Sequence, residues 1–266
     1  MIYFGFLKLD TTTRSGEGNL EFKTGASHNQ STGTLFGSFE LKYKLPEYNV
    51  TLLEKWNTDG LLGSEITFEP EDSRLKGTRL TLDTSYAPQI GKRSGKIKAE
   101  FAHRSFKLNG DVSLGRAPLI NGAAVFGYEG WLIGYASGWD TEKAKVTHSN
   151  LAFGRKVGDY ALHTFVNDNS EFGGNVWHRV RSDLEMGVSV GWASREQTNR
   201  FGLAAKYQLD SDTLLRAKLS NASQLALAMT HNLKRDLKLT TSVLVNLQNF
   251  NAGGHKLGLG LEYDGK

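Results

Sequence analysis

The sequence predicts an all-β protein, a nineteen-stranded transmembrane β-barrel, from three observations. Apolar and polar residues alternate one by one along most of the 266 residues, and a period of two is typical of strands with one apolar face. Alternating runs recur at nearly even spacing, with turn residues between them. The chain has 4 Pro and 30 Gly, which suits paired strands, because Pro cannot donate to a strand ladder and Gly fits tight turns.

Each expected strand is an alternating run between two turn signals. In 184–193, for example, the even positions hold Leu, Met, Val, Val and Trp, whereas the odd positions hold Glu, Gly, Ser, Gly and Ala. The average repeat of about 14 residues fits a strand of about 10 residues and a short hairpin turn. In chain order the nineteen expected strands are 2–10, 19–28, 33–44, 49–56, 62–69, 79–86, 96–103, 108–115, 121–128, 131–140, 148–157, 160–167, 173–180, 184–193, 201–209, 213–220, 223–232, 237–246 and 255–263.

Turn residues separate these runs, and no linker, low-complexity tract or shift in composition divides the chain. We therefore expect a single transmembrane β-barrel domain over residues 1–266. The clearest turn signals are rich in Gly, Asp, Asn or Ser and lie at 15–18, 58–60, 91–95, 158–159, 210–212 and 251–254.

The polar face of the expected strands favours a membrane barrel over a soluble one. No run of about 18 apolar residues occurs, so the sequence predicts no transmembrane helix. Soluble barrels of about eight strands fill their interior with side chains, but here the second face carries Lys, Glu, Asp, Ser, Gly and Thr. A nineteen-stranded barrel with that interior would hold water and turn its apolar face to lipid. A soluble sandwich or small barrel is the alternative.

Charged residues fall on this polar face, and bases modestly outnumber acids there. In a wide, wet pore such side chains favour anions without excluding cations, although the solvated face of a soluble sheet would have the same composition. The basic positions are Lys8, Lys23, Lys42, Lys55, Arg79, Lys96, Lys98, Lys206, Arg216, Lys218, Lys238 and Lys256, and the acidic positions are Asp10, Glu21, Glu40, Glu65, Asp83, Glu100, Asp111, Glu185 and Glu262.

Several stretches carry a resemblance to a known family. Residues 207–221, YQLDSDTLLRAKLSN, followed by ALAM at 226–229, look like a porin signature, and 54–59, 127–132, 166–174 and 251–262 resemble the same family. That family is the mitochondrial voltage-dependent anion channels, or eukaryotic porins. The resemblance covers essentially the whole chain and implies a nineteen-stranded barrel of the mitochondrial outer membrane. Its first and last strands are expected to pair in parallel, because alternate strands reverse direction and the count is odd.

The resemblance also implies a function and its partners. We expect a voltage-dependent, anion-preferring channel for nucleotides, phosphate, chloride and small organic acids, in contact with membrane lipids. The alternative is a docking protein for hexokinase or apoptosis regulators with incidental conductance; a homo-oligomer is also left open. No cofactor is expected, with NAD or ATP at most a permeant or weak ligand. By resemblance, nicotinamide nucleotides touch the wall at Gln224, Leu225, Ala226, Ser242, Val243, Leu244, Val245 and Asn246.

Glu54 breaks the alternation of its strand. It shares the parity of Val50, Leu52 and Trp56 and is therefore expected to face lipid, where a carboxylate is costly. By resemblance it matches a lipid-facing glutamate that the family ties to dynamics, dimerisation and hexokinase binding. A glutamate that reaches the headgroups, or that faces a partner barrel, is the alternative.

The last expected strand resembles a targeting signal. Its pattern of a polar residue, Gly and two hydrophobic residues is similar to the sorting signal of mitochondrial outer-membrane barrels. A plain strand with Gly where backbones crowd would show the same pattern. The positions that carry it are Lys256, Gly258, Leu261 and Tyr263.

The start of the chain departs from the family. Family members carry a further segment before the first strand, including an amphipathic helix inside the pore, whereas the strand pattern here starts near Met1. We therefore expect an open-state conductance at least as large as that of helix-bearing relatives, with altered voltage closure. No cleavable signal peptide is expected at this end. A second departure is at 75–77, where Leu-Lys-Gly stands in place of the family's Gly-Leu-Lys, and no nucleotide contact is expected there.

The remaining signals argue against other classes. With no Cys, no disulfide framework or thiolate chemistry is expected. A net charge of +4 is too small by itself to indicate nucleic acid. The seven His are scattered, so no metal site is expected, and 167–171 is read as a hairpin turn in preference to a cation site. No Ser-His-Asp arrangement, P-loop or dinucleotide fingerprint occurs, so an enzyme is not expected.

Overall fold

The computed structural model describes residues 4–15, 17–71, 75–194, 198–248 and 250–265. Nineteen strands and two short 3₁₀ helices, η1 (Pro46–Tyr48) and η2 (Phe250–Ala252), make up this part of the chain. The strands are β1 (Phe6–Arg14), β2 (Leu20–Asn29), β3 (Leu35–Leu45), β4 (Val50–Asn57), β5 (Leu62–Phe68), β6 (Thr78–Ala87), β7 (Lys92–Ala102), β8 (Phe106–Leu114), β9 (Leu119–Tyr128), β10 (Trp131–Asp140), β11 (Lys145–Val157), β12 (Tyr160–Asn167), β13 (Glu171–Arg179), β14 (Leu184–Ala193), β15 (Thr198–Gln208), β16 (Thr213–Ser220), β17 (Gln224–Lys234), β18 (Leu237–Asn246) and β19 (Lys256–Gly265).

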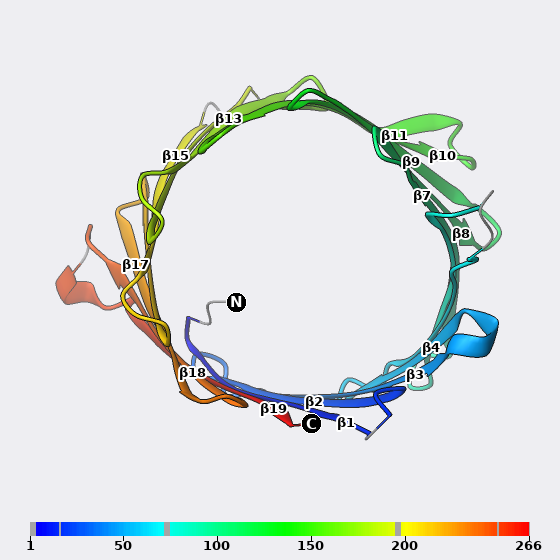
Figure 1. The fold of residues 1–266 in the computed structure, drawn as a ribbon, viewed down its shortest axis with the longest axis horizontal. Coiled ribbons are helices and arrows are strands. Elements are labelled where there is room, and N and C mark those ends of the chain that lie inside the picture. The colour runs from blue at the N-terminus through cyan, green and yellow to red at the C-terminus, as the bar shows by residue number, and fades with distance from the viewer. Residues whose placement is uncertain (1–3, 16, 72–74, 195–197, 249, 266) are drawn as a thin grey trace.

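All nineteen strands form one closed sheet (Figure 1). Each strand pairs antiparallel with the next along the chain, and β1 closes the ring by pairing with β19 in parallel, from Leu7 opposite Leu259 to Thr13 opposite Gly265. An odd number of alternating strands leaves the first and the last running the same way, so closure requires this parallel seam. The predicted barrel and its parallel closure are confirmed. Closure also removes the open edges on which sheets aggregate.

The barrel wall is one sheet thick and has no packed core. Among the described residues, the buried hydrophobic ones are Ala226 and Ala228 alone. Large apolar side chains are exposed throughout, with Leu35, Ile90 and Tyr128 each more than two-thirds exposed. The accessible surface is 17966 Å², whereas a compact soluble monomer of this mass would expose about 11,500 Å². The excess reflects an open wall exposed on both sides, and the large apolar side chains on its outer side need a nonaqueous neighbour.

The ladder fixes which face each side chain takes. In β4, Leu52 stands opposite Ile66 of β5, and Leu53 stands opposite Glu65. The first pair continues into Leu82 of β6 and the second into Asp83. Neighbouring rows therefore alternate between an apolar outward face and a polar inward face, as strand geometry demands.

The first strand is shifted from the predicted position. It was expected at 2–10, but β1 runs from Phe6 to Arg14, and 1–3 lie outside the described residues. Gly5 has a φ of +78°, which interrupts extended backbone, whereas Thr11, Thr12 and Thr13 are β-branched and prolong the strand. The parity of Lys8 and Asp10 is unchanged by this shift.

Two register shifts alter the alternation. One lies between Gly138 and Trp139, opposite β11, and the other between Asn232 and Lys234 in β17. A bulge puts two residues against one and moves the following side chains to the other face. In the described part of the chain, no helix is long and apolar enough to cross a bilayer.

Candidate functional site

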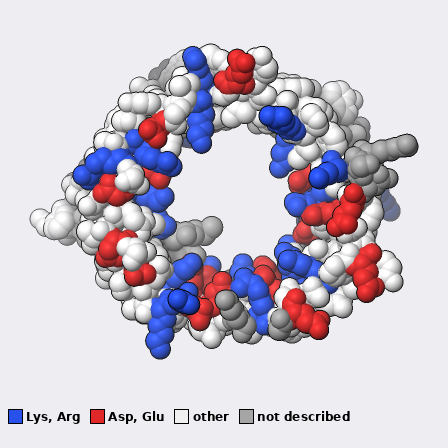
Figure 2. Space-filling model, viewed as in Figure 1, with Lys and Arg blue, Asp and Glu red and all other residues white. Residues whose placement is uncertain are grey.

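The inward face of the barrel is the candidate site, because the ladder collects charged side chains there from nearly every strand. Figure 2 shows Lys, Arg, Asp and Glu side chains gathered around an open passage along the axis. In one such row, Glu65 of β5 stands opposite Asp83 of β6, which stands opposite Lys96 of β7. Side chains two residues apart along each strand repeat this face, so the charges line the passage from one mouth to the other.

Bases outnumber acids on this face. The inward Lys and Arg side chains of the described strands are Lys8, Arg14, Lys23, Lys42, Lys44, Lys55, Arg79, Lys92, Lys96, Lys98, Lys107, Lys145, Lys156, Arg179, Arg200, Lys206, Arg216, Lys218, Lys238 and Lys256. The inward acids are Asp10, Glu21, Glu40, Glu65, Asp83, Glu100, Asp111, Asp140, Glu171, Glu185, Glu262 and Asp264. All the charged positions predicted from parity fall in these two sets.

Cross-strand ion pairs hold part of this charge in place. Lys98 Nζ lies 2.7 Å from Asp83 Oδ2, and Lys96 Nζ lies 3.2 Å from Asp111 Oδ2. Lys206 and Glu185 form a similar pair at 3.4 Å. Each of these side chains is partly exposed to water, so a single pair contributes little to stability. Within each pair the positive and negative charges largely cancel. The remaining bases therefore determine the sign of the electrostatic potential in the passage.

Several inward lysines have no such neutralisation, and three of them lie well apart along the sequence. Among the described residues, Lys42, Lys218 and Lys256 have no carboxylate oxygen within 4.0 Å. They lie in β3, β16 and β19, so they flank the passage on separate parts of the wall. A positive excess in a wet pore attracts anions over distances of about 8–10 Å at ordinary salt.

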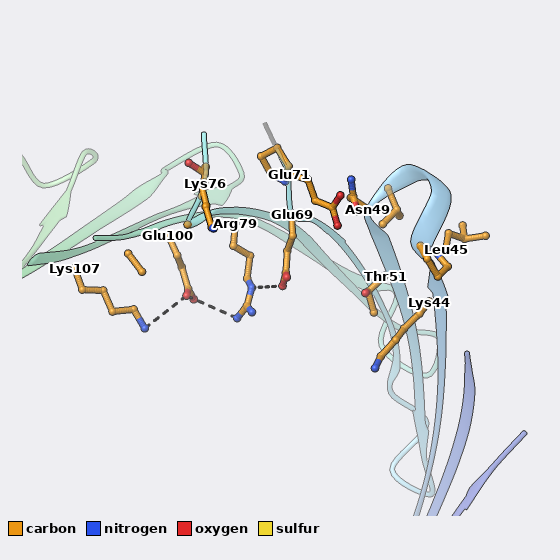
Figure 3. A pocket seen from close by; sticks show the side chains of 16 residues that line it. Lys44, Leu45, Asn49, Thr51, Glu69, Glu71, Lys76, Arg79, Glu100 and Lys107 are labelled. Atoms are coloured by element: carbon orange, nitrogen blue, oxygen red, sulfur yellow. Dashed lines mark hydrogen bonds and ion pairs between the residues drawn. The ribbon is translucent and has the colours of Figure 1, made fainter. Parts of the chain in front are cut away.

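A cavity of about 760 Å³ opens at one mouth beside β3, β6, β7 and β8 (Figure 3). Arg79 Nε lies 2.5 Å from Glu69 Oε1, and its guanidinium lies 4.0 Å from Glu100. Lys107 lies 3.9 Å from the same Glu100 carboxylate, and Lys44 points into the cavity from the end of β3. An ion that enters here therefore meets closely mixed charges.

The parallel seam concentrates charge of both signs. Asp10 of β1 stands beside Glu262 of β19, and Lys8 Nζ lies 2.7 Å from Asp10 Oδ2. Arg14 bridges the seam, since it lies 3.0 Å from Glu21 and 2.5 Å from Asp264. The Arg14–Asp264 pair joins the first strand to the last and so adds a contact across the closure, whereas the Lys8–Asp10 pair lies within β1.

Glu54 lies on the outward face, as its parity predicts. It stands opposite Leu41 and Ser64, and the Ser64 hydroxyl donates a hydrogen bond of 2.6 Å to Glu54 Oε2. The Thr84 hydroxyl in turn donates to the Ser64 carbonyl at 3.2 Å. The carboxylate thus has one local donor on an otherwise apolar surface. Its role in dynamics or association stays a prediction.

The nucleotide candidates divide between the two faces. Gln224 stands opposite Asn246 and Ala226 opposite Leu244, and these four share the inward face with Ser242. The side chains of Leu225, Val243 and Val245 take the opposite face, because neighbours in a strand alternate. They cannot line the passage, so the expectation of wall contact is corrected for these three. Contact at the five inward positions stays a prediction.

The proposed sorting residues all lie in β19, the last strand. Lys256 and Gly258 face inward, whereas Leu261 and Tyr263 face outward. The polar residue and the Gly of the pattern therefore lie on one face of β19, and its two hydrophobic residues lie on the other. Recognition by a sorting machinery stays a prediction.

Several inward bases were not singled out in the sequence. Lys156 follows the parity of its strand, and Lys44 and Lys107 lie at strand ends, so closer attention to alternation finds them. Lys145 is different, because the register shift at Gly138/Trp139 puts it on the inward face together with His148, which has the opposite parity. A bulge of this kind leaves no clear mark in the alternation.

Residues 167–171, weighed above as a cation site, form the turn between β12 and β13. Within the described residues, no group of three or more His, Asp or Glu side chains is arranged to hold a metal ion. The segment 167–171 is a hairpin turn: Asp168 and Asn169 have φ values of +49° and +52°, and the Ser170 N–H donates to the Asn167 carbonyl at 2.9 Å.

Comparisons with known proteins agree with this geometry. A sequence model of the family described as eukaryotic porin matches residues 3–258. The chain is 48% identical over 262 residues to the "Non-selective voltage-gated ion channel VDAC2" of Meleagris gallopavo, covering 98% of this chain and 88% of that protein. It is 45% identical over 262 residues to the "Voltage-dependent anion-selective channel" of Drosophila melanogaster, covering 98% and 92%.

Among solved structures the similarity concerns the fold alone. A triple mutant of the Rhodopseudomonas blastica porin superposes with a TM-score of 0.56 at 10% identity, over 89% of this chain and 96% of that one.

Proposed function

The chain belongs to the eukaryotic porin family, and from this premise we propose that it is a voltage-dependent channel that passes ions and small anionic metabolites, with a weak preference for anions. It is not an enzyme. Two relatives have names that differ on selectivity, one being called non-selective and the other anion-selective. The distribution of charge in this chain favours the second description in a weak form.

The observation that carries the proposal is the division of the wall into two faces. Outward rows are apolar and exposed, which suits hydrocarbon, and inward rows are charged and surround an open passage (Figure 2). A closed barrel satisfies every ladder hydrogen bond internally, which is the condition for spanning a bilayer. The protein is therefore an integral membrane barrel, and the passage is its route for solutes.

The weak preference follows from the balance of inward charge. Lys42, Lys218 and Lys256 are unpaired, but Lys96 and Lys98 are largely offset by nearby carboxylates. Such a pore raises the local concentration of anions without a barrier high enough to exclude cations. Nucleotides, phosphate, chloride and small organic acids fit this charge, and NAD or ATP would pass as permeant or weakly bound solutes.

We place the channel in the mitochondrial outer membrane. The support is the family match over most of the chain and the pattern of β19, which resembles a sorting signal. A second function as a docking protein for hexokinase or apoptosis regulators, or in a homo-oligomer, is favoured by one observation. Glu54 and Ser64 form a polar spot on the outward face, which a partner inside the membrane could cover.

Planar-bilayer recording of the purified full chain tests the channel. We expect discrete conductance steps that decrease at high voltage of either sign. Efflux of ATP from liposomes that also contain a large dextran gives a second measurement, in which ATP leaves and dextran is retained. A chain that inserts as a folded barrel but neither conducts nor releases ATP would leave only the docking function.

A further inference from the structure

Arg155 places a cation on the outward face of the barrel. In β11 it shares this face with Leu151 and Phe153, and it stands opposite Trp131 of β10. Within the described strands, the outward charged residues are Glu54, Arg93, Arg155 and Lys234. A guanidinium is costly in hydrocarbon unless it reaches the polar interface, so its height on the wall decides what it contacts.

Arg155 lies close to the mouth. Its partner Trp131 is the first residue of β10, directly after the turn at 129–130, and β11 ends two residues later at Val157. The neighbouring Lys156 N–H donates to the Gly130 carbonyl at 2.8 Å, so the backbone here is held against that turn. Trp and Tyr are typical of the level at which lipid headgroups meet hydrocarbon. Arg155 lies beside Trp131, which stands opposite Tyr128.

Among the described residues, the Arg155 guanidinium lies over an aromatic ring and forms no ion pair. The Arg155 guanidinium carbon lies 4.1 Å from the centre of the Trp131 ring, and Trp131 lies 5.2 Å from Phe153 between ring centres. Tyr128, which stands opposite Trp131, is 73% exposed. No acidic side chain of the described residues forms an ion pair with Arg155. We name Tyr128, Trp131 and Phe153 the aromatic shelf.

We propose that Arg155 and the aromatic shelf bind the headgroup phosphate of an anionic phospholipid. A guanidinium that stacks its flat face on an indole keeps its edge N–H groups free, and their fork matches two phosphate oxygens. The shelf continues into Ile133 and Leu151, which offer an apolar surface to an acyl chain. An unpaired cation at the interface selects a lipid with net negative charge. The inference rests on the membrane placement given under the proposed function.

A lipid titration of the folded full chain tests the site. The Trp131 indole N–H signal, assigned by its loss in Trp131→Phe, is followed by NMR in phosphocholine micelles. Short-chain phosphatidylglycerol is added in one series, short-chain phosphatidylcholine in a second, and inorganic phosphate in a third. We expect a saturable shift in the first series alone. An equal saturable shift with phosphate would show a plain anion site, and one with phosphatidylcholine would show a lack of charge recognition; either result overturns the proposal.

Variants separate this site from the general charge of the protein. Arg155→Gln is expected to weaken phosphatidylglycerol binding by about fivefold or more, as loss of one interfacial cation predicts. Arg155→Lys keeps the charge without the fork and should fall between. Lys156→Gln is the matched control, because it removes the same charge one residue away on the inward face, and its affinity should stay within about twofold of the parent.

Unchanged affinity in Arg155→Gln would overturn the proposal, as would an equal loss in Lys156→Gln. Arg155→Lys answers the same question if the Gln variant does not fold. The titration needs no conductance, so its failure leaves the channel untouched. Conversely, a chain that binds the lipid but does not conduct would refute the channel and leave this site in place.

Discussion

At the level of single residues, the function of the barrel depends on the face that each charged side chain takes. Glu54 faces outward and accepts a hydrogen bond from Ser64 at 2.6 Å. Glu54→Gln should stabilise the barrel in bicelles by about 1 kcal/mol, because an acidic side chain costs less than the roughly 2–4 kcal/mol of a lipid-facing base but is still unfavourable. Glu65→Gln, on the inward face of the next strand, is the control and should bring no such gain. A less stable Glu54→Gln variant in thermal unfolding would show that the carboxylate is not in contact with lipid.

A second prediction at this scale concerns the turn between β15 and β16. Asp210 Oδ1 accepts the backbone N–H groups of Asp212 at 2.8 Å and Thr213 at 2.7 Å. The Asp212 N–H, followed by Thr213, lowers the pKa of the Asp210 carboxyl. A lowered folded pKa stabilises the hairpin above the ordinary carboxyl value of about 3.9 and loses that effect as the pH falls through the folded value.

Asp210→Asn should therefore flatten the loss of stability between about pH 5 and pH 2. Urea unfolding at several pH values measures this slope. Asp59→Asn is the control, since the Asp59 carboxylate accepts no hydrogen bond from the described residues. Parallel slopes for Asp210→Asn and the parent protein would contradict the assigned role of the two N–H groups.

At the scale of elements, close backbone approach explains one glycine of the sheet. Gly173 of β13 stands opposite Phe165 of β12; an added Cβ would meet the Phe165 ring and lie 2.9 Å from the Val190 carbonyl oxygen. Gly173→Ala should destabilise the barrel by about 1–3 kcal/mol, as overpacking does. At Gly122 of β9 nothing lies within 4 Å of an added Cβ, so Gly122→Ala should be neutral or stabilising by up to about 1 kcal/mol. Urea unfolding in micelles compares the two, and equal effects would refute the steric explanation.

The elements also show how far alternation determines the fold. Strand number, order and face could be predicted, because most strands have one apolar and one more polar side and most are joined to the next by a short turn. The bounds of β1 could not, because the positive φ of Gly5 delays its start and the run Thr11–Thr13 extends it to the turn at 15–18. The inward position of Lys145 was also hidden, since a bulge reverses parity without changing composition. The cross-strand ion pairs could not be predicted either, because alternation shows which face a side chain takes but not how far it lies from an opposite charge.

At the scale of the whole molecule, closure and charge act together. The parallel seam of β1 and β19 removes both sheet edges, and the wall is a single layer (Figure 1). This wall leaves its exposed apolar side chains to lipid and its inward charges to water. The whole chain carries a net charge of +4, and the inward face concentrates the bases. We therefore infer that this inward charge lines a conducting path.

The reversal potential in a salt gradient across a planar bilayer tests that claim most directly. The parent channel should show a reversal potential of the sign given by a mild preference for chloride over potassium. The triple variant Lys42→Glu, Lys218→Glu and Lys256→Glu changes lysines without ion pairs, and should move the potential to the cation-preferring side. Arg93→Gln, which removes an outward cation, should leave it unchanged. A triple variant with the same reversal potential as the parent channel would contradict the account, because these side chains would then not line the path of the ions.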